Sequence, residues 1–251
     1  MRNLLWLLLT LASANVYSQT ASQNLSKNDR VIIRSQRTVI NRTGRMVRQN
    51  PEKRQATIVQ PLFSGLTPAV LTKLRTTVAL KNVFGSSLQE YKSDTWLDEF
   101  SYEVHHNQNH LLDIAFSQSG SGAYPDGETK HFVFDLNTGL VVKASELFKQ
   151  DTLPTLAEKI NAKLQAEIER TISETGDEGK SAYESQDSLV FKTENLDSFS
   201  VSSKGITFLY DAGFPHVIQA LEPDGEYFFT YEELKPYIKL GGLLGQFVRQ
   251  R

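Results

Sequence analysis

The sequence contains no cysteine among its 251 residues. This absence excludes disulfides, thiol nucleophiles and cysteine metal sites, so a secreted form of the chain must be stable through its core alone. Methionine and tryptophan are scarce, with two residues each. Hydrophobic residues still make up 39% and aromatic residues 10% of the chain. That content is sufficient for one large or two small globular domains.

Long apolar runs are also nearly absent. The one such run, LLWLLLTLA at residues 4–12, is too short to cross a bilayer as a helix. Arg2 precedes the run and small or polar residues follow it, which is the order typical of a secretory signal peptide. We expect cleavage after Ser18, and a retained membrane anchor is the alternative. Cleavage would place the remaining chain in the periplasm or outside a bacterial cell, with no transmembrane helix.

Neither sign of charge dominates the chain. Without residues 1–18 it has 26 basic and 29 acidic residues, a net charge of −3, which gives no case for nucleic-acid binding. Residues 19–56 differ, because nine basic and two acidic residues lie between Lys27 and Arg54. This basic arm is either a solvated, partly disordered segment or a region that attaches to an anionic surface such as a phosphate-rich envelope polymer. Two apolar clusters, at 31–33 and 39–40, indicate a short strand or hairpin inside it.

From Thr57 onward the patterns predict an α+β fold with two small subdomains, at residues 57–125 and 126–240, and a tail at 241–251. Each subdomain is expected to hold an antiparallel or mixed sheet packed with a helix. A Thr67-Pro68 pair begins the first predicted helix. The second helix is predicted by an apolar stripe, whose members are Leu156, Ile160, Leu164, Ile168 and Ile172.

Shorter sequence patterns predict further local elements in the remaining chain. They predict a strand over 57–60 that ends at Pro61, a polar loop over 176–187, a hairpin turn at 203–205 and a capping box from Thr230 to Glu233.

Alternating apolar residues predict a β-hairpin over residues 100–116. A three-residue loop at 107–109 would pair Val104 with Leu112, so that every apolar residue meets another across the strands.

That register also brings titratable residues together. Glu103 would lie opposite Asp113, and two carboxylates can act as acid and base in glycoside cleavage. His106 and His110 would be cross-strand neighbours with His105 beside them, forming either a metal site or a polar hairpin tip. Because no further ligand on the correct face is assured, we expect no metal site and no cofactor.

Residues 120–139 read GSGAYPDGETKHFVFDLNTG. Glycines before a strand can cradle an anionic ligand or let the chain turn. A phosphate cradle requires a helix after the glycines, and here a strand is predicted instead. We therefore interpret the glycines near 120 and Asn137-Thr138-Gly139 as structural turns, with a positive φ at Gly139.

A family resemblance is carried by HFVFDLNTGLVVKASELFK, the following Ala-, Lys- and Leu-rich helix, GITFLYD and YFFTYEELKPYI. Over about residues 57–239 the chain resembles a domain of unknown function. That domain occurs outside the membrane in the lysozyme-sensing anti-sigma factor RsiV and as the non-catalytic region of PdaC-type peptidoglycan deacetylases. This chain departs from the family pattern in two places. It has Tyr124 where the family often has His, and its segment Phe214 to Ile218 contains no tyrosine where the family segment is Tyr-rich.

The resemblance implies a secreted or periplasmic binding module that recognises cell-wall glycan or an envelope protein such as a lysozyme, without turnover. The candidate binding residues are Tyr124, His106, His110 and His131. Tyr124 is either an aromatic face for the ligand or a turn-packing side chain. The alternative function is an envelope hydrolase acting on peptidoglycan or another polysaccharide, for which Glu103 and Asp113 are the candidate catalytic residues. No G-x-S-x-G elbow supports a serine hydrolase.

Overall fold

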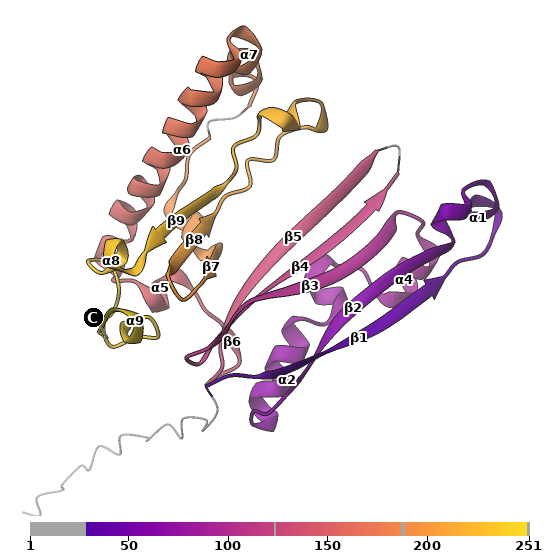
Figure 1. The fold of residues 1–251 in the computed structure, drawn as a ribbon, viewed down its shortest axis with the longest axis horizontal. Helices are drawn as coiled ribbons and strands as arrows, with labels where there is room; N and C mark the ends of the chain where they lie inside the picture. Colours follow the sequence, from indigo (N-terminus) through magenta and orange to yellow (C-terminus); the bar gives the residue numbers. More distant parts are fainter. Residues whose placement is uncertain (1–28, 123, 187–188, 250–251) are drawn as a thin grey trace, which may run out of the picture.

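The computed structural model describes residues 29–122, 124–186 and 189–249 (Figure 1). The expected signal peptide and its cleavage site lie outside the described residues. Within these ranges, no helix has both the length and the apolar character needed to cross a membrane.

The first architectural unit is a six-stranded sheet, called the large sheet, in the order β1-β2-β3-β4-β5-β6 (Figure 1). Strands β2 and β3 are parallel and all other neighbours are antiparallel. The parallel pair needs a crossover, which three helices supply. The strands are β1 (Ile32–Asn41), β2 (Gln55–Ser64), β3 (Leu97–Gln108), β4 (Leu111–Ser121), β5 (Pro125–Asp135) and β6 (Leu140–Val141).

The crossover helices cover one face of the large sheet. They are α2 (Pro68–Thr77), α3 (Leu80–Phe84) and α4 (Leu88–Ser93), and α1 (Arg45–Gln49) lies between β1 and β2. Leu74 of α2 and Val83 of α3 are buried with Phe100 and Phe116 from the strands. Alternate strand residues supply this core, as expected for a sheet with one helix-covered face.

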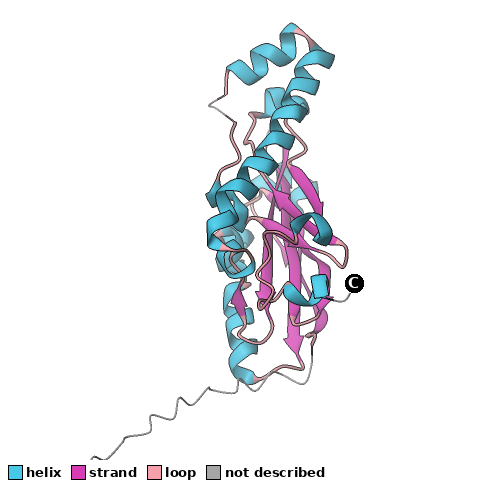
Figure 2. Cartoon of the chain, turned by 90° about the vertical axis from the view of Figure 1, so that its left-hand side faces the viewer, coloured by secondary structure: helices cyan, strands magenta, loops and turns pink. Residues whose placement is uncertain are grey.

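The second unit is a three-stranded antiparallel sheet, the small sheet, of β7 (Phe199–Val201), β8 (Gly205–Leu209) and β9 (Glu226–Thr230). The long helix α6 (Leu153–Thr175) runs beside it (Figures 1 and 2). Buried apolar residues of α6 pack with those of the small sheet. Shorter helices complete the unit: α5 (Ala144–Leu147), α7 (Asp177–Glu184), α8 (Tyr231–Leu234) and α9 (Gly245–Arg249).

The expected α+β class with two sheets is confirmed, but the boundaries between segments differ from the expectation. The large sheet continues through β5 and β6 to Val141, past the expected boundary at residue 125. Part of the expected basic arm is β1, which pairs with β2 along ten residues. The expected tail includes α9, and it buries Leu244 just before this helix and Val248 within it. In each case strand pairing or side-chain burial, rather than local composition, determines where the structural unit begins and ends.

The hairpin of β3 and β4 forms, but its predicted register is wrong. Val104 pairs with Ile114, not with Leu112. The turn has two residues, Asn109 and His110, with φ of 56° and 59°, which matches a type I′ connection rather than a three-residue loop. A bulge at His105 then shifts the pairing.

The bulge also moves the titratable side chains. Glu103 pairs with Ala115, and Asp113 pairs with His106, so the predicted Glu103–Asp113 pair does not exist. His110 lies in the turn and is not the cross-strand neighbour of His106. His106 faces the same side of the sheet as Asp113 and is buried.

The glycine prediction is confirmed in one place and wrong in another. Gly139 has a φ of 73° and follows the predicted turn. Gly120 lies inside β4, paired with Asp126, whereas Gly122 lies between β4 and β5 in a turn, as predicted. A Cβ at Gly120 would lie 2.1 Å from the Trp96 carbonyl oxygen, so close backbone approach requires this glycine.

Three local predictions are confirmed: the helix that begins at Pro68, the hairpin of β7 and β8, and the capping box at Thr230. Two are wrong. Strand β2 continues through Pro61 to Ser64, where Pro61 pairs with Ser35 of the edge strand β1. The expected loop at 176–187 contains helix α7, because Gly176 takes a positive φ and turns the chain into a second helix.

Candidate functional site

A pocket of about 500 Å³ lies where the β4–β5 turn meets the segment before β9. Four rings line it, from Trp96, Tyr124, Phe214 and His216. We call it the aromatic pocket; Gly122, Pro125, Asp126 and Gln219 complete its lining. Its walls come from both units of the fold, so neither unit alone contains it.

Tyr124 and His216 meet across the aromatic pocket. Their ring centroids are 5.2 Å apart with an edge-to-face angle of 63°. The Tyr124 side chain is 66% exposed, so its ring is free to contact a ligand. His216 Nδ1 lies 3.3 Å from Gln219 Oε1 within a 3₁₀ turn at residues 216–221. The two sequence segments noted as departures from the family pattern therefore lie side by side.

The indole of Trp96 is held by the loop before β3. The Trp96 backbone N–H donates to Asp94 Oδ1 at 2.9 Å, and its carbonyl accepts from Ser121 N at 3.1 Å. Beneath this loop the Lys53 ammonium is 2.7 Å from Asp98 and donates to Ser121 Oγ. These bonds fix one wall of the aromatic pocket to the end of β4.

Phe214 forms the opposite, buried wall. Its ring packs edge-on against Tyr183 of α7 at 5.3 Å, and its backbone N–H donates to Glu222 Oε1. Tyr183 in turn donates its hydroxyl to the Leu221 carbonyl at 2.6 Å. Helix α7, which the sequence patterns did not predict, is therefore what supports this side of the aromatic pocket.

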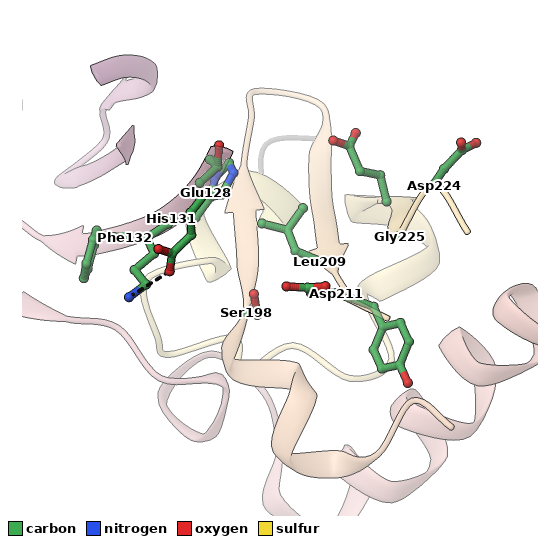
Figure 3. Close-up of a pocket in the computed structure, with 12 residues that line it drawn as sticks. Glu128, His131, Phe132, Ser198, Leu209, Asp211, Asp224 and Gly225 are labelled. Carbon is green, nitrogen blue, oxygen red and sulfur yellow. Dashed lines mark ion pairs between the residues drawn. The ribbon is translucent and has the colours of Figure 1, made fainter. Parts of the chain in front are cut away.

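A second pocket of about 540 Å³ lies between β5 and the end of the small sheet (Figure 3). We call it the edge pocket. One wall is five successive residues of β5, 128–132. The other wall is formed by Ser198, Leu209, Tyr210, Asp211, Asp224, Gly225 and Glu226.

The charges of the edge pocket are unequal. The Lys130 ammonium lies 3.1 Å from Glu128 Oε1, donates to the Val83 carbonyl, and sits 5.3 Å from the Phe84 ring. Lys130 therefore neutralises Glu128 and points toward α3. Since it is the only Lys or Arg among the described residues of the lining, Asp211, Asp224 and Glu226 remain as an acidic wall.

His131 lies in the edge pocket beside His105, with ring centroids 5.5 Å apart. Burial lowers the pKa of His131, the neighbouring His105 lowers it further, and Glu103 opposes both effects. The Nδ1 atom of His131 is buried without a hydrogen-bond partner in the described part of the chain. His131 is therefore not oriented by any carboxylate, as a general base would be.

Asp113 lies behind this face and has no exposed surface. Its Oδ2 accepts hydrogen bonds from Ser200 Oγ and Val201 N of β7, each at 2.5 Å, and thus joins the large sheet to the small sheet. Burial raises the pKa of Asp113, which the two hydrogen bonds and His105 partly offset. A carboxylate with no access to solvent cannot contact a polymer substrate.

The other candidate histidines lie apart from both pockets. His106 is buried, with Nε2 3.1 Å from the Gln108 carbonyl and its ring 6.0 Å from that of Phe247. His110 occupies the hairpin turn, where its backbone bonds to Asp29 and Leu136. Neither residue lines the aromatic pocket or the edge pocket.

The described residues contain no group of three or more His, Asp or Glu side chains that could hold a metal ion. Of the predicted binding residues, Tyr124 and His131 line pockets, one in each. Sequence patterns missed Trp96, the acidic wall and the role of Phe214 and His216. For the aromatic pocket, the sequence offered one signal, which is that its segments contain aromatic residues. These segments are far apart in the sequence, so their proximity could not be inferred.

Comparisons with known proteins identify the fold. No protein-family model and no curated protein matches the chain. A DUF3298 family protein from Bacteroides fragilis has a similar structure, with a TM-score of 0.58 at 15% identity over 87% of this chain and 100% of that one.

A DUF3298 family protein from Pseudomonas aeruginosa is also similar, with a TM-score of 0.56 at 12% identity over 85% of this chain and 96% of that one. At these identities the likeness is one of fold alone. The chain therefore has the fold of two structural neighbours from a domain family of unknown function.

Proposed function

We propose that this chain is an exported, non-catalytic binding module of the bacterial cell envelope, which recognises cell-wall glycan or an envelope protein such as a lysozyme. The resemblance to the RsiV and PdaC-associated domain suggested this function, and the aromatic pocket is the observation that carries it. Exposed aromatic rings with adjacent hydrogen-bonding side chains suit the apolar faces and hydroxyl groups of a sugar. Asp126 and Gln219 supply the polar groups.

The alternative function, a hydrolase acting on peptidoglycan or another polysaccharide, has weaker support. The candidate pair does not form, because Glu103 pairs with Ala115 and Asp113 is fully buried. The edge pocket holds a histidine and carboxylates, but no hydrogen bond orients His131 toward any of them in the described residues. An enzyme requires such a base within reach of its partner.

Sedimentation with purified peptidoglycan, with lysozyme as a separate bait, tests the proposal. We expect binding by the mature protein and its loss in Tyr124→Ala, whose exposed ring contributes little to folding. Phe228→Ala is the matched control, since Phe228 is an exposed aromatic residue on β9 outside the aromatic pocket. Equal binding by both variants would contradict the site.

Incubation with peptidoglycan separates binding from catalysis. We expect neither soluble fragments nor released acetate. Release of either product by the wild type would contradict the binding module and favour the hydrolase instead.

A further inference from the structure

The edge pocket contains a sheet edge that none of the described strands covers. Strand β5 pairs with β4 along its whole length, but with β6 only at Phe134 and Asp135. Within the described residues, the outer edge of β5 before these positions has no hydrogen-bonded strand beside it. Exposed edges of this kind are templates for an added strand.

The direction of the backbone groups follows from the ladder. The Val133 carbonyl accepts from Val142 N and therefore faces outward, away from β4. Because backbone groups of an antiparallel strand alternate between its two sides, Thr129 and His131 also turn their N–H and C=O groups outward. No described residue forms a hydrogen bond with these four groups.

The wall facing this edge is acidic. Asp211, Asp224 and Glu226 line it, and Lys130 on the opposite wall is already paired with Glu128. The side chains of Asp224 and Glu226 have no hydrogen-bond or ion-pair partner in the described part of the chain. A ligand in this position would therefore meet free backbone donors and acceptors on one side and uncompensated negative charge on the other. Figure 3 shows the side chains of Asp211 and Asp224 on the charged wall.

We propose that the free edge of β5 binds an extended, basic peptide segment of another protein by strand addition. The backbone of the peptide pairs with Thr129 and His131, and its Lys or Arg side chains face Asp224 and Glu226. Backbone pairing provides affinity in this mode and the facing side chains provide specificity. This site is separate from the aromatic pocket and does not depend on the function proposed for it.

The chemistry of the edge pocket favours a peptide over the other ligand classes. An anionic polymer would face the repulsion of three carboxylates. A sugar has no regular series of amide donors and acceptors to match the strand edge that forms one wall of this pocket. Only a chain with its own peptide groups satisfies both outward N–H and both outward C=O groups.

A short synthetic peptide serves as the probe: acetyl-Lys-Val-Lys-Val-Lys-Val amide carrying a fluorophore, followed by fluorescence anisotropy. Two matched peptides isolate the contributions. One replaces Lys by Glu, and the other carries N-methyl groups on alternate residues, which keeps the charge but removes the pairing donors. We expect binding of the first peptide, at least tenfold weaker binding of the N-methylated peptide, and no binding of the Glu peptide.

Protein variants test the two walls separately. Asp224→Asn/Glu226→Gln should weaken binding about tenfold, since it removes two facing charges. Glu169→Gln/Glu174→Gln, which removes two exposed charges from α6, is the control and should bind as the wild type does.

Thr129→Pro removes one outward N–H at an edge position where proline is tolerated, and should also weaken binding. Tyr124→Ala should leave peptide binding unchanged.

Equal affinity for the N-methylated and unmodified peptides would overturn strand addition and leave only charge attraction. Equal peptide affinity of Asp224→Asn/Glu226→Gln and Glu169→Gln/Glu174→Gln would contradict the proposed role of the acidic wall in binding. Both outcomes can be read without Thr129→Pro, should that variant fail to fold. Loss of peptide binding in Tyr124→Ala would place the peptide in the aromatic pocket and also contradict the proposal.

Discussion

Asp113 is the one fully buried polar or charged side chain among the described residues. Its Oδ2 connects β4 to the backbone of β7, while its Oδ1 has no partner in the described part of the chain. An ionised carboxylate in such a site carries a desolvation penalty that two neutral donors offset only in part. A single residue thus joins the two sheets and limits the stability of that junction.

We predict that Asp113→Ala lowers the free energy of unfolding by about 1–3 kcal/mol, because it leaves Ser200 Oγ and Val201 N without an acceptor. Asp113→Asn keeps an acceptor for these donors and should stay close to the wild type at neutral pH. Urea denaturation measures both. Equal losses for the two variants would show that the hydrogen bonds are not what holds the junction.

The pKa of Asp113 also predicts a pH dependence. Burial raises this pKa above its ordinary value of 3.8, so between the two values the folded state binds more protons than the unfolded state. The contribution of Asp113 to stability therefore falls as the pH rises from 3.8 through the folded pKa. Relative to Asp113→Asn, the wild type should be most stable at the acidic end of a urea series. A difference that does not change with pH would contradict the raised pKa.

Gly139 is a second position where one residue decides local structure. Its φ is 73°, and a Cβ would lie 2.8 Å from the Val70 carbonyl oxygen. We expect Gly139→Ala to lower the free energy of unfolding by about 1 kcal/mol or more. Gly241→Ala is the control, because that glycine has open space around it and no positive φ. Thermal melting compares the two, and an unchanged melting temperature in Gly139→Ala would argue against strain in this turn.

At the scale of elements, short segments that lack a strong sequence pattern stabilise the junction between the sheets. Helix α9 is five residues long, yet Phe247 stacks on Tyr231 with ring centroids 4.5 Å apart. Gln246 Nε2 donates to the Asn109 carbonyl at the tip of the β3–β4 hairpin. The C-terminal segment therefore contacts both units.

We predict that Phe247→Ala lowers the free energy of unfolding by about 2 kcal/mol, less than for a fully buried phenylalanine because the ring is half-buried. Phe228→Ala, which removes an exposed ring from β9, should have a smaller effect. Chemical denaturation of both variants checks this. If the two losses are equal, α9 does not contribute specifically to the junction.

At the scale of the whole molecule, the two sheets share one interface and leave two pockets between them. Leu111 and Val133 of the large sheet belong to the core of the small sheet and α6. The aromatic pocket and the edge pocket both take one wall from each unit. The relative position of the sheets therefore determines the shape of both pockets, which is a property of the whole chain.

Export is also a property of the whole chain and stays a prediction. The apolar run at residues 4–12 between Arg2 and a series of small residues motivates it. Amino-terminal sequencing of the protein from an envelope fraction should begin at or near Gln19. A chain that still begins at Met1 after fractionation would contradict cleavage.

The sequence by itself determined the α+β class, the two helices that start at Pro68 and follow Thr152, the capping box at Thr230 and the left-handed turn at Gly139. These features depend on periodicity or on the φ of single residues. Both signals are local, because neighbouring residues alone produce them.

Only the tertiary structure decided the register of β3 and β4 and the sites that depend on it. Shifting the pairing by two residues keeps the same apolar residues on one face, so alternation could not distinguish Val104–Leu112 from Val104–Ile114. The bulge at His105 then turned His106 onto the face of Asp113, which is the face that meets β7. Trp96 and Tyr124 of the large-sheet unit became neighbours of His216 because the two sheets pack together, and residues so distant in the sequence leave no local pattern.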